Sequence, residues 1–175
     1  MPHHVSPARW TVWFWPALIT TLVFDLVTKY AVFAQPQSSL PDWMEKHYNT
    51  GVAWSMLAEH PEFVAGLTAA LIPLLVWVWW SGYRKLGWPE NLAFGLILGG
   101  ALGNGYDRAL AMFGVWPGVR DFLHVDLGFW PLNPWPTFNI ADSGISIGFV
   151  LLLARAFVTS PKPAPAPSAS SPPCS

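Results

Sequence analysis

An apolar stretch over residues 63–83 contains no charged side chain, and this feature restricts the chain to very few folds. A transmembrane helix needs about 20 predominantly apolar residues, so this stretch is long enough to cross a bilayer. Three further apolar stretches, 12–33, 92–113 and 138–158, are interrupted by charged residues. We interpret them as spans too, because Leu, Ile, Val, Phe, Ala and Gly fill the positions between the charges. The sequence therefore predicts an all-α integral membrane protein with four transmembrane helices.

The composition excludes a water-soluble globule. Of the 175 residues, 53% are hydrophobic and only 11% are charged, whereas a soluble domain carries roughly 25% charged residues. The net charge of -1 leaves no basic excess for nucleic acid, and the single cysteine, Cys174, excludes an internal disulfide framework. We expect one membrane domain over residues 1–158. The Pro/Ala/Ser-rich residues 159–175 are expected to form a disordered cytoplasmic tail.

Positive charges in the loops predict the orientation of the spans. The cations on one side are Arg9, Arg84, Lys85, Arg155 and Lys162. The other two loops have one cation each, Lys46 and Arg120, set among several acidic residues. The positive-inside rule then puts both termini in the cytoplasm and residues 34–62 and 114–137 outside. We expect a multi-pass protein of the cytoplasmic membrane.

A cleaved signal peptide ending at Ala34 is an alternative interpretation of the first stretch. Asp25 and Lys29 lie inside its apolar run, and such charges argue against a signal peptide.

The predicted orientation gathers the polar residues of the spans at one depth, near the outer surface. They are Asp25, Lys29, Asn104, Asp107, Arg108, Asn139 and Asp142. Such a cluster is typical of a water-dependent site that acts on a membrane substrate. More ordinary roles stay open: Asp25 and Lys29, four residues apart, can form a structural pair. Arg108 can anchor a helix end or bind a loop backbone, and Asn139 can cap the fourth helix.

The residue types at this depth favour carboxylate chemistry. All five histidines lie in tails or loops without zinc-site spacing, and no serine-nucleophile motif is present, so we expect no metal and no cofactor. Two aspartates that share one proton can activate water. Four aspartates lie near the outer face, namely Asp107, Asp121, Asp126 and Asp142. The residues alone do not decide which two form the pair.

Two other classes of protein compete with an enzyme. A channel or proton-coupled transporter would distribute its polar residues along the membrane depth, whereas these gather on one side. A non-enzymatic assembly or lipid-binding protein would not need an aspartate pair.

Five segments in a fixed order resemble a known family. They are FDLVTKYAV at 24–32, NTGVAWSML at 49–57, GGALGNGYDRAL at 99–110, VRDF at 119–122 and FNIADSGISIG at 138–148. In this order, over about residues 12–158, they resemble the lipoprotein signal peptidases (type II signal peptidases) of bacteria.

The resemblance implies a membrane aspartyl endopeptidase that cuts prolipoproteins before the diacylglyceryl-modified cysteine and releases the signal peptide. It implies Asp121 and Asp142 as the catalytic pair. The substrate-binding or supporting residues that it implies are Asn49, Gly51, Asn104, Asp107, Arg108, Asn139, Asp25 and Lys29. It also implies an extracytoplasmic β segment around residues 49–55 that cradles the substrate, and an outer loop. Prolipoproteins and membrane lipids are the expected partners of a monomer.

Two features depart from the family pattern. Gly105 stands where the family usually has a bulky apolar residue, and we expect it to loosen the third helix. Residues 123–137, which include His124 and Asp126, form a rather long connection. We interpret Asp126 as a solvated loop charge.

Overall fold

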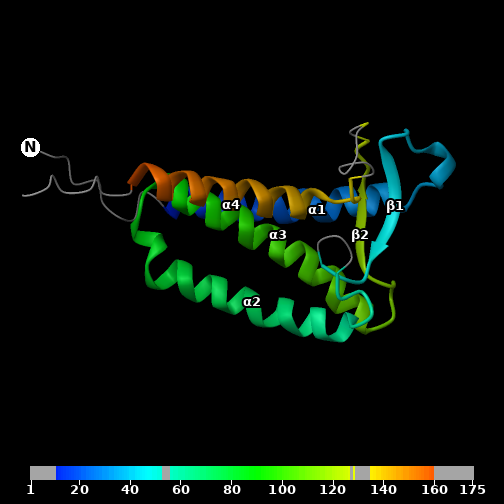
Figure 1. Cartoon of the computed structure of the whole chain (residues 1–175), viewed down its shortest axis with the longest axis horizontal. Helices are drawn as coiled ribbons and strands as arrows, with labels where there is room; N and C mark the ends of the chain where they lie inside the picture. Colours follow the sequence, from blue (N-terminus) through cyan, green and yellow to red (C-terminus); the bar gives the residue numbers. More distant parts are fainter. Residues whose placement is uncertain (1–10, 53–55, 127, 129–134, 160–175) are drawn as a thin grey trace, which may run out of the picture.

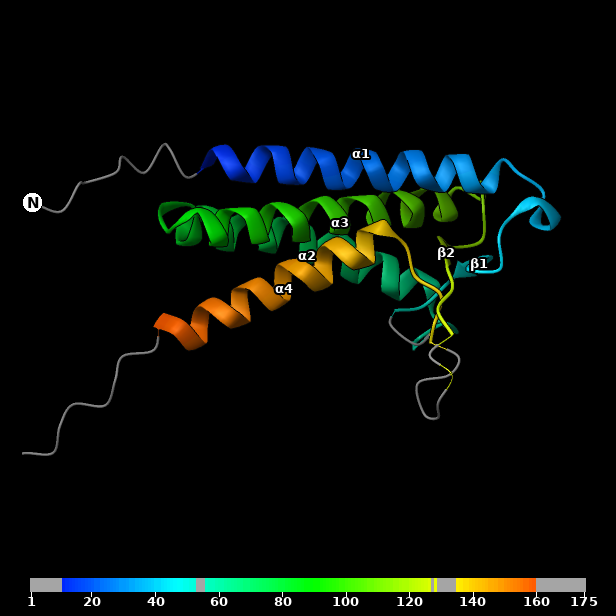
Figure 2. The ribbon, with the colours of Figure 1, turned by 90° about the horizontal axis from the view of Figure 1, so that it is seen from above.

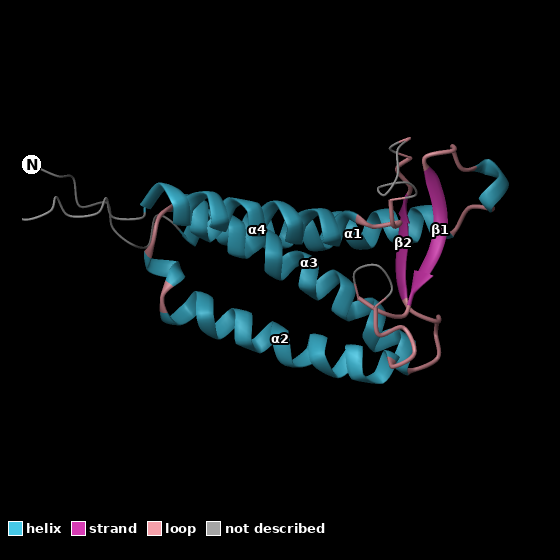
Figure 3. Cartoon of the chain, viewed as in Figure 1, coloured by secondary structure: helices cyan, strands magenta, loops and turns pink. Residues whose placement is uncertain are grey.

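The computed structural model describes residues 11–52, 56–126, 128 and 135–159. Helices make up its body, and two short strands lie together at one end (Figures 1 and 3). The elements are α1 (Phe14–Phe33), β1 (Met44–Asn49), α2 (Pro61–Ser81), α3 (Trp88–Met112), β2 (Val119–Leu123) and α4 (Ile140–Thr159), with short 3-10 turns at Thr11–Trp13, Gln37–Ser39 and Tyr83–Lys85. Of the predicted tail, 159–175, the first residue, Thr159, ends α4, and residues 160–175 lie outside the described residues, as do two of the orienting cations, Arg9 and Lys162.

Helix α3 is the centre of the bundle and packs against α1, α2 and α4 (Figures 1 and 2). Glycines permit the close approach of its neighbours. A Cβ atom on Gly99 would lie 2.6 Å from the Leu18 carbonyl oxygen of α1, and one on Gly148 of α4 would lie 2.6 Å from the Ala93 carbonyl oxygen of α3. Small residues at such contacts are typical of helices packed inside a membrane.

Three described helical segments are long and apolar enough to cross a membrane: Thr11–Phe33, Pro61–Ser81 and Ile140–Val158. They contain α1, α2 and α4. The predicted span at 92–113 corresponds to α3, which is not among the three. Its polar residues, such as Glu90, Asn104 and Asp107, lower its hydropathy but are buried against the other helices.

The surface of the bundle is apolar. Large hydrophobic side chains are exposed on every outer helix, for example Trp15 on α1, Leu74 on α2 and Val150 on α4. An exposed apolar surface of this extent is typical of contact with lipid. At the end opposite the strands, Phe14 stacks on Trp79 with ring centroids 3.7 Å apart.

The two strands pair antiparallel, with His47 opposite Asp121 and Asn49 opposite Val119. The β segment was expected at 49–55, but β1 ends at Asn49. Its pairing partner is β2, the strand that follows α3. Residues 53–55 lie outside the described residues. Leu123, the last residue of β2, forms a bridge with Phe138. This bridge returns the chain beside β2 immediately before α4 begins.

Gly105 does not interrupt α3, which continues to Met112. The expectation of a loosened helix is wrong, because Gly105 lies against α2: a Cβ atom at this position would lie 3.1 Å from Ile72 Cδ1. The glycine makes room for α2 at this end of the bundle.

Candidate active site

The polar helix residues that the sequence singled out meet at the end of the bundle that carries the strands. This end consists of the last turns of α1 and α3, the start of α4, and both strands (Figure 1). Every residue that the sequence and the resemblance singled out for the site lies in this region, in α1, α3, α4 or the strands and their flanking turns.

A buried ion cluster joins α1, α3 and β2. Lys29 Nζ lies 2.8 Å from Asp25 Oδ2 and 3.2 Å from Asp107 Oδ2. Arg120 Nη2 lies 2.8 Å from Asp107 Oδ1. Side chains of all four residues are at most 2% exposed. The two carboxylates and two cations balance one another, as buried charges require.

Asp25 extends this cluster to α4, because its Oδ1 accepts a hydrogen bond of 2.9 Å from the backbone N–H of Ala141. The expected pairing of Asp25 with Lys29 is confirmed. Ala141 precedes Asp142, so α1 also holds the first turn of α4 in place.

Asp121 and Asp142 are held by asparagine side chains. Asp121 Oδ1 accepts from Asn139 Nδ2 at 2.6 Å, and its Oδ2 accepts from Asn49 Nδ2 at 3.2 Å. Asp142 Oδ1 accepts from Asn104 Nδ2 at 2.8 Å. Its Oδ2 accepts from the backbone N–H of Asn139 at 3.1 Å. Each of the four carboxylate oxygens therefore has a fixed donor.

The amide of Asn104 links the two halves of the site. Its Oδ1 accepts from Asn139 Nδ2 at 3.0 Å and from Lys29 Nζ at 3.0 Å, while its Nδ2 donates to Asp142. The Asn104 side chain thus reaches from α3 across to Lys29 of α1 and Asp142 of α4.

The pKa of Asp121 is raised from 3.8 to about 7. Burial of this side chain, which is 1% exposed, is the largest cause, and the charge of Asp142 is the second. Hydrogen bonds from Asn49 and Asn139 and the charge of Lys29 act in the opposite direction. Near neutral pH, Asp121 therefore holds a proton for part of the time beside Asp142.

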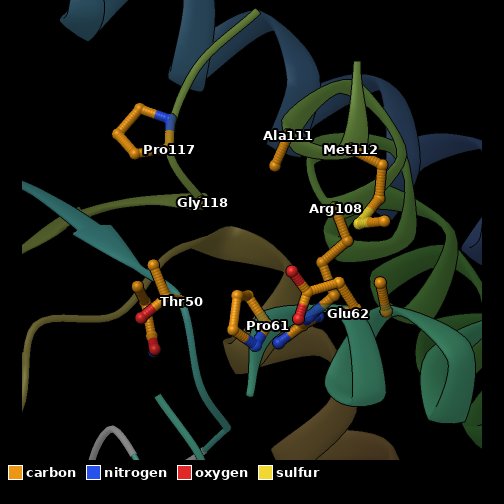
Figure 4. Close-up of a pocket in the computed structure, with 10 residues that line it drawn as sticks. Thr50, Pro61, Glu62, Arg108, Ala111, Met112, Pro117 and Gly118 are labelled. Carbon is orange, nitrogen blue, oxygen red and sulfur yellow. The ribbon is translucent and has the colours of Figure 1, made fainter. Parts of the chain in front are cut away.

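Arg108 and Asn49 line a hollow, and Asn49 connects it to the site because its side chain also donates to Asp121. The hollow has a volume of about 190 Å³ and is lined by Asn49, Thr50, Pro61, Glu62, Ala65, Arg108, Ala111, Met112, Pro117 and Gly118. Figure 4 shows the Arg108 side chain reaching toward Pro61 and Glu62 at the start of α2, with Pro117 and Gly118 on the far side. Arg108 Nη2 donates to the Gly51 carbonyl oxygen at 2.9 Å, so the expected bond from Arg108 to a loop backbone is confirmed.

Asp126 and His124, both in the long connection after β2, are bound to other groups. Asp126 is exposed, and its Oδ1 accepts a bond of 2.7 Å from the N–H of Gly128. His124 Nδ1 lies 3.4 Å from Glu45 Oε2. Among the described residues, no group of three His, Cys, Asp or Glu side chains could hold a metal ion.

Sequence reasoning missed Arg120, which it counted as a loop cation. Arg120 is 1% exposed and lies in β2. Its guanidinium carbon sits 4.4 Å from the centroid of the Tyr30 ring and 4.1 Å from that of Trp116. Neither helical spacing nor loop charge indicates such a position, which depends on the strand pairing and on the path of the loop.

Comparison with known proteins agrees with the geometry. Residues 17–158 match the family described as "Signal peptidase (SPase) II". The chain is 35% identical over 165 residues to a lipoprotein signal peptidase of Aquifex aeolicus (strain VF5), covering 87% of this chain and 91% of that protein. It is 33% identical over 160 residues to that of Serratia proteamaculans (strain 568), covering 84% and 87%.

Two solved structures, both described as bacterial membrane enzymes, have a similar fold. Each superposes with a TM-score of 0.65 and 27% sequence identity. The match covers 83% of this chain and 90% of the first structure, and 82% and 92% for the second.

Proposed function

Because the chain belongs to the signal peptidase II family, and is thus a membrane protease that removes signal peptides from prolipoproteins, we propose that Asp121 and Asp142 perform the hydrolysis. The bond that they cut is the one before the diacylglyceryl-modified cysteine. The observation that carries this proposal is that both carboxylates lie at the same end of the bundle, with each oxygen fixed by an asparagine donor. Such preorganisation is what a catalytic pair of acids requires.

The reaction follows from one proton shared between the two carboxylates. The ionised member takes a proton from a water molecule as the water oxygen attacks the scissile carbonyl carbon. The protonated member donates its proton to the carbonyl oxygen. The tetrahedral intermediate then collapses and the C–N bond breaks. The leaving amine takes up the proton that one carboxyl group had taken from water, and a hydroxyl group of the intermediate returns its proton to the other carboxylate, which restores the shared proton and leaves a carboxylic acid product. A pKa of about 7 for Asp121 supports its role as the protonated member at neutral pH.

The surrounding polar residues hold the pair and the substrate backbone. Asn104 and Asn139 orient the carboxylates. Arg108 and Asn49 line the hollow, which Asn49 connects to Asp121 and where a polypeptide could lie against the Gly51 turn. Asp25, Lys29 and Asp107 support this arrangement from α1 and α3.

We place α3 in the membrane as the fourth span. Its 25 residues, at about 1.5 Å each, exceed a hydrocarbon core about 30 Å thick. The polar side chains that lower its hydropathy face the other helices and not lipid.

With four spans, both termini lie in the cytoplasm and the aspartates lie near the outer face. The signal helix of the substrate enters sideways from the bilayer. The enzyme acts as a monomer, because one chain supplies both carboxylates and the donors that bind their oxygens.

A gel-shift assay of prolipoprotein processing tests the aspartate pair. The full chain is purified in detergent and incubated with a diacylglyceryl-modified prolipoprotein. Asp121→Asn and Asp142→Asn should each abolish cleavage, because Asn keeps the shape of the side chain and loses its charge. Asp126→Asn is the matched control, since Asp126 is exposed, and should cleave as the wild type does. Full activity in Asp121→Asn or Asp142→Asn would overturn the proposal.

A further inference from the structure

Arg120 is a buried cation at the site, and the hydrolysis proposed above assigns it no role. Its Nε and Nη2 both donate to Asp107 Oδ1, at 3.2 and 2.8 Å, and its backbone N–H donates to Asp107 Oδ2 at 3.0 Å. Main chain and side chain of one strand residue are thus bound to one carboxylate of α3. This contact fixes the position of β2 relative to α3.

Two aromatic rings complete the enclosure of the guanidinium. Tyr30 belongs to α1, and Trp116 belongs to the loop between α3 and β2. A cation over aromatic faces is stabilised further when water is excluded, and here the arginine is 1% exposed. The planar guanidinium, which both stacks and donates in a fork, suits this environment, whereas a lysine ammonium does not.

Arg120 is directly adjacent to Asp121, and side chains alternate between the two faces of a strand. Holding Arg120 on the face toward α1 and α3 therefore fixes Asp121 on the opposite face. The carbonyl oxygen of Arg120 also accepts a bond of 3.4 Å from Asn139 Nδ2, the same nitrogen that donates to Asp121 Oδ1. One amide nitrogen of Asn139 thus binds both the backbone of Arg120 and the side chain of Asp121.

Arg120 also balances charge beside the catalytic pair. Without it, the cluster of Asp25, Lys29 and Asp107 would carry one net negative charge. The other ionisable groups around Asp121 come from each neighbouring element: Lys29 on α1, Asp107 and Arg108 on α3, Asp142 on α4, and His47 opposite it on β1.

We propose that Arg120 is a positioning residue for the reaction: by binding Asp107 between Tyr30 and Trp116, it holds the Asp121 carboxylate in register with Asp142. This inference goes beyond the proposed function and rests on it. It predicts that the loss of Arg120 impairs the chemical step in molecules that are still folded.

The test compares Arg120→Met and Arg120→Lys in the full chain, with kcat and KM measured across pH on a diacylglyceryl-modified prolipoprotein. Arg120→Met should lower kcat about tenfold or more with KM little changed, because small misplacements of a reacting group are costly. It should also move the high-pH limb of the profile to higher pH, since net negative charge then increases near Asp121. Arg120→Lys keeps the charge, so the high-pH limb should stay in place. The lysine ammonium does not replace the forked bonds and the stacking of the guanidinium, so kcat should still fall.

Arg84→Met is the matched control. Arg84 also lies over an aromatic ring, with its guanidinium carbon 4.0 Å from the centroid of Trp80, but at the opposite end of the bundle. It should change neither kcat nor the pH limb.

The proposal is overturned if folded Arg120→Met has the same kcat and the same high-pH limb as the wild type. It is also overturned if the activity of the variant falls only in proportion to the fraction of molecules that are folded. Should Arg120→Met not fold, Arg120→Lys decides: wild-type kcat overturns the role, and a lower kcat at unchanged KM supports it. Failure of the proposed function can be told apart from failure of this inference. If Asp121 is not catalytic, Asp121→Asn cleaves the prolipoprotein, and this result does not depend on any variant of Arg120.

Discussion

Asn139 and Asp142 bind each other twice: the backbone N–H of Asn139 donates to Asp142 Oδ2 at 3.1 Å, and the backbone N–H of Asp142 donates to Asn139 Oδ1 at 2.9 Å. This reciprocal arrangement is a capping box at the start of α4. The expected cap by Asn139 is confirmed. The same side chain also donates to Asp121, so one residue both begins the helix and holds the proposed pair.

Two substitutions of Asn139 separate these two roles. Serine can still cap the helix, whereas alanine cannot, so Asn139→Ser should be more stable than Asn139→Ala by about 1 kcal/mol. Both lack the amide donor to Asp121 and should lose most activity. Thermal unfolding in detergent and the prolipoprotein gel shift measure the two effects. Wild-type activity in Asn139→Ser would show that the amide donor is dispensable.

The activity should fall as the pH rises above about 7. Asp121, with its pKa raised to about 7, loses its proton in this range, and the pair then lacks the acid that protonates the carbonyl oxygen. The measurement is kcat/KM of the wild type between pH 5 and 9 at constant ionic strength. A profile that stays flat through pH 7 to 9 would exclude Asp121 as the group that supplies the proton.

The stability should depend on pH through the same group. A carboxyl whose pKa is higher in the folded state binds protons more tightly when folded, so its ionisation lowers stability as the pH rises from about 4 to about 7. Replacement by asparagine removes this dependence. The melting temperature of the wild type relative to Asp121→Asn should therefore decrease over this interval.

Asp126→Asn serves as the control for that measurement, because it removes one exposed carboxylate of the same type. A difference between wild type and Asp121→Asn that rises with pH would contradict the raised pKa.

Much of this arrangement could be predicted from sequence, because polar side chains of membrane helices avoid lipid and face the interior or the ends of the bundle. The first, second and fourth spans agree with α1, α2 and α4, and the Asp25–Lys29 pair follows from helical spacing. The polar residues that the sequence singled out for the site do gather at one end, whereas Glu90 and Arg155 pair with each other elsewhere in the bundle.

What could not be predicted depends on contacts between segments that are distant in sequence. The strand β1 ends at Asn49, and its bounds follow from its pairing with β2. The bridge from Leu123 to Phe138 is likewise a tertiary contact. Arg120 was interpreted as a loop cation because nothing local shows that Asp107, Tyr30 and Trp116 enclose it. Alternation along the strand becomes informative only when the strand itself is known.

The helix contacts of α3 give a last prediction, which concerns the bundle and not the chemistry. Gly99 faces α1 so closely that a Cβ atom would lie 2.6 Å from the Leu18 carbonyl oxygen and 2.9 Å from Thr21 Cβ. Neither the backbone nor a β-branched side chain can withdraw easily, so Gly99→Ala should separate α1 from α3 and destabilise the protein by about 1–3 kcal/mol.

Gly66 in α2 offers the matched control, because nothing lies within 4 Å of the Cβ atom that alanine would add there. Gly66→Ala should be neutral or should stabilise α2 by up to about 1 kcal/mol, since alanine favours a helix over glycine. The melting temperatures of both variants in the same detergent give the comparison. If Gly99→Ala melts at or above the temperature of Gly66→Ala, then α1 and α3 are not in the close contact described above, and the position of Lys29 beside Asn104 and Asp107 would have to be revised with it.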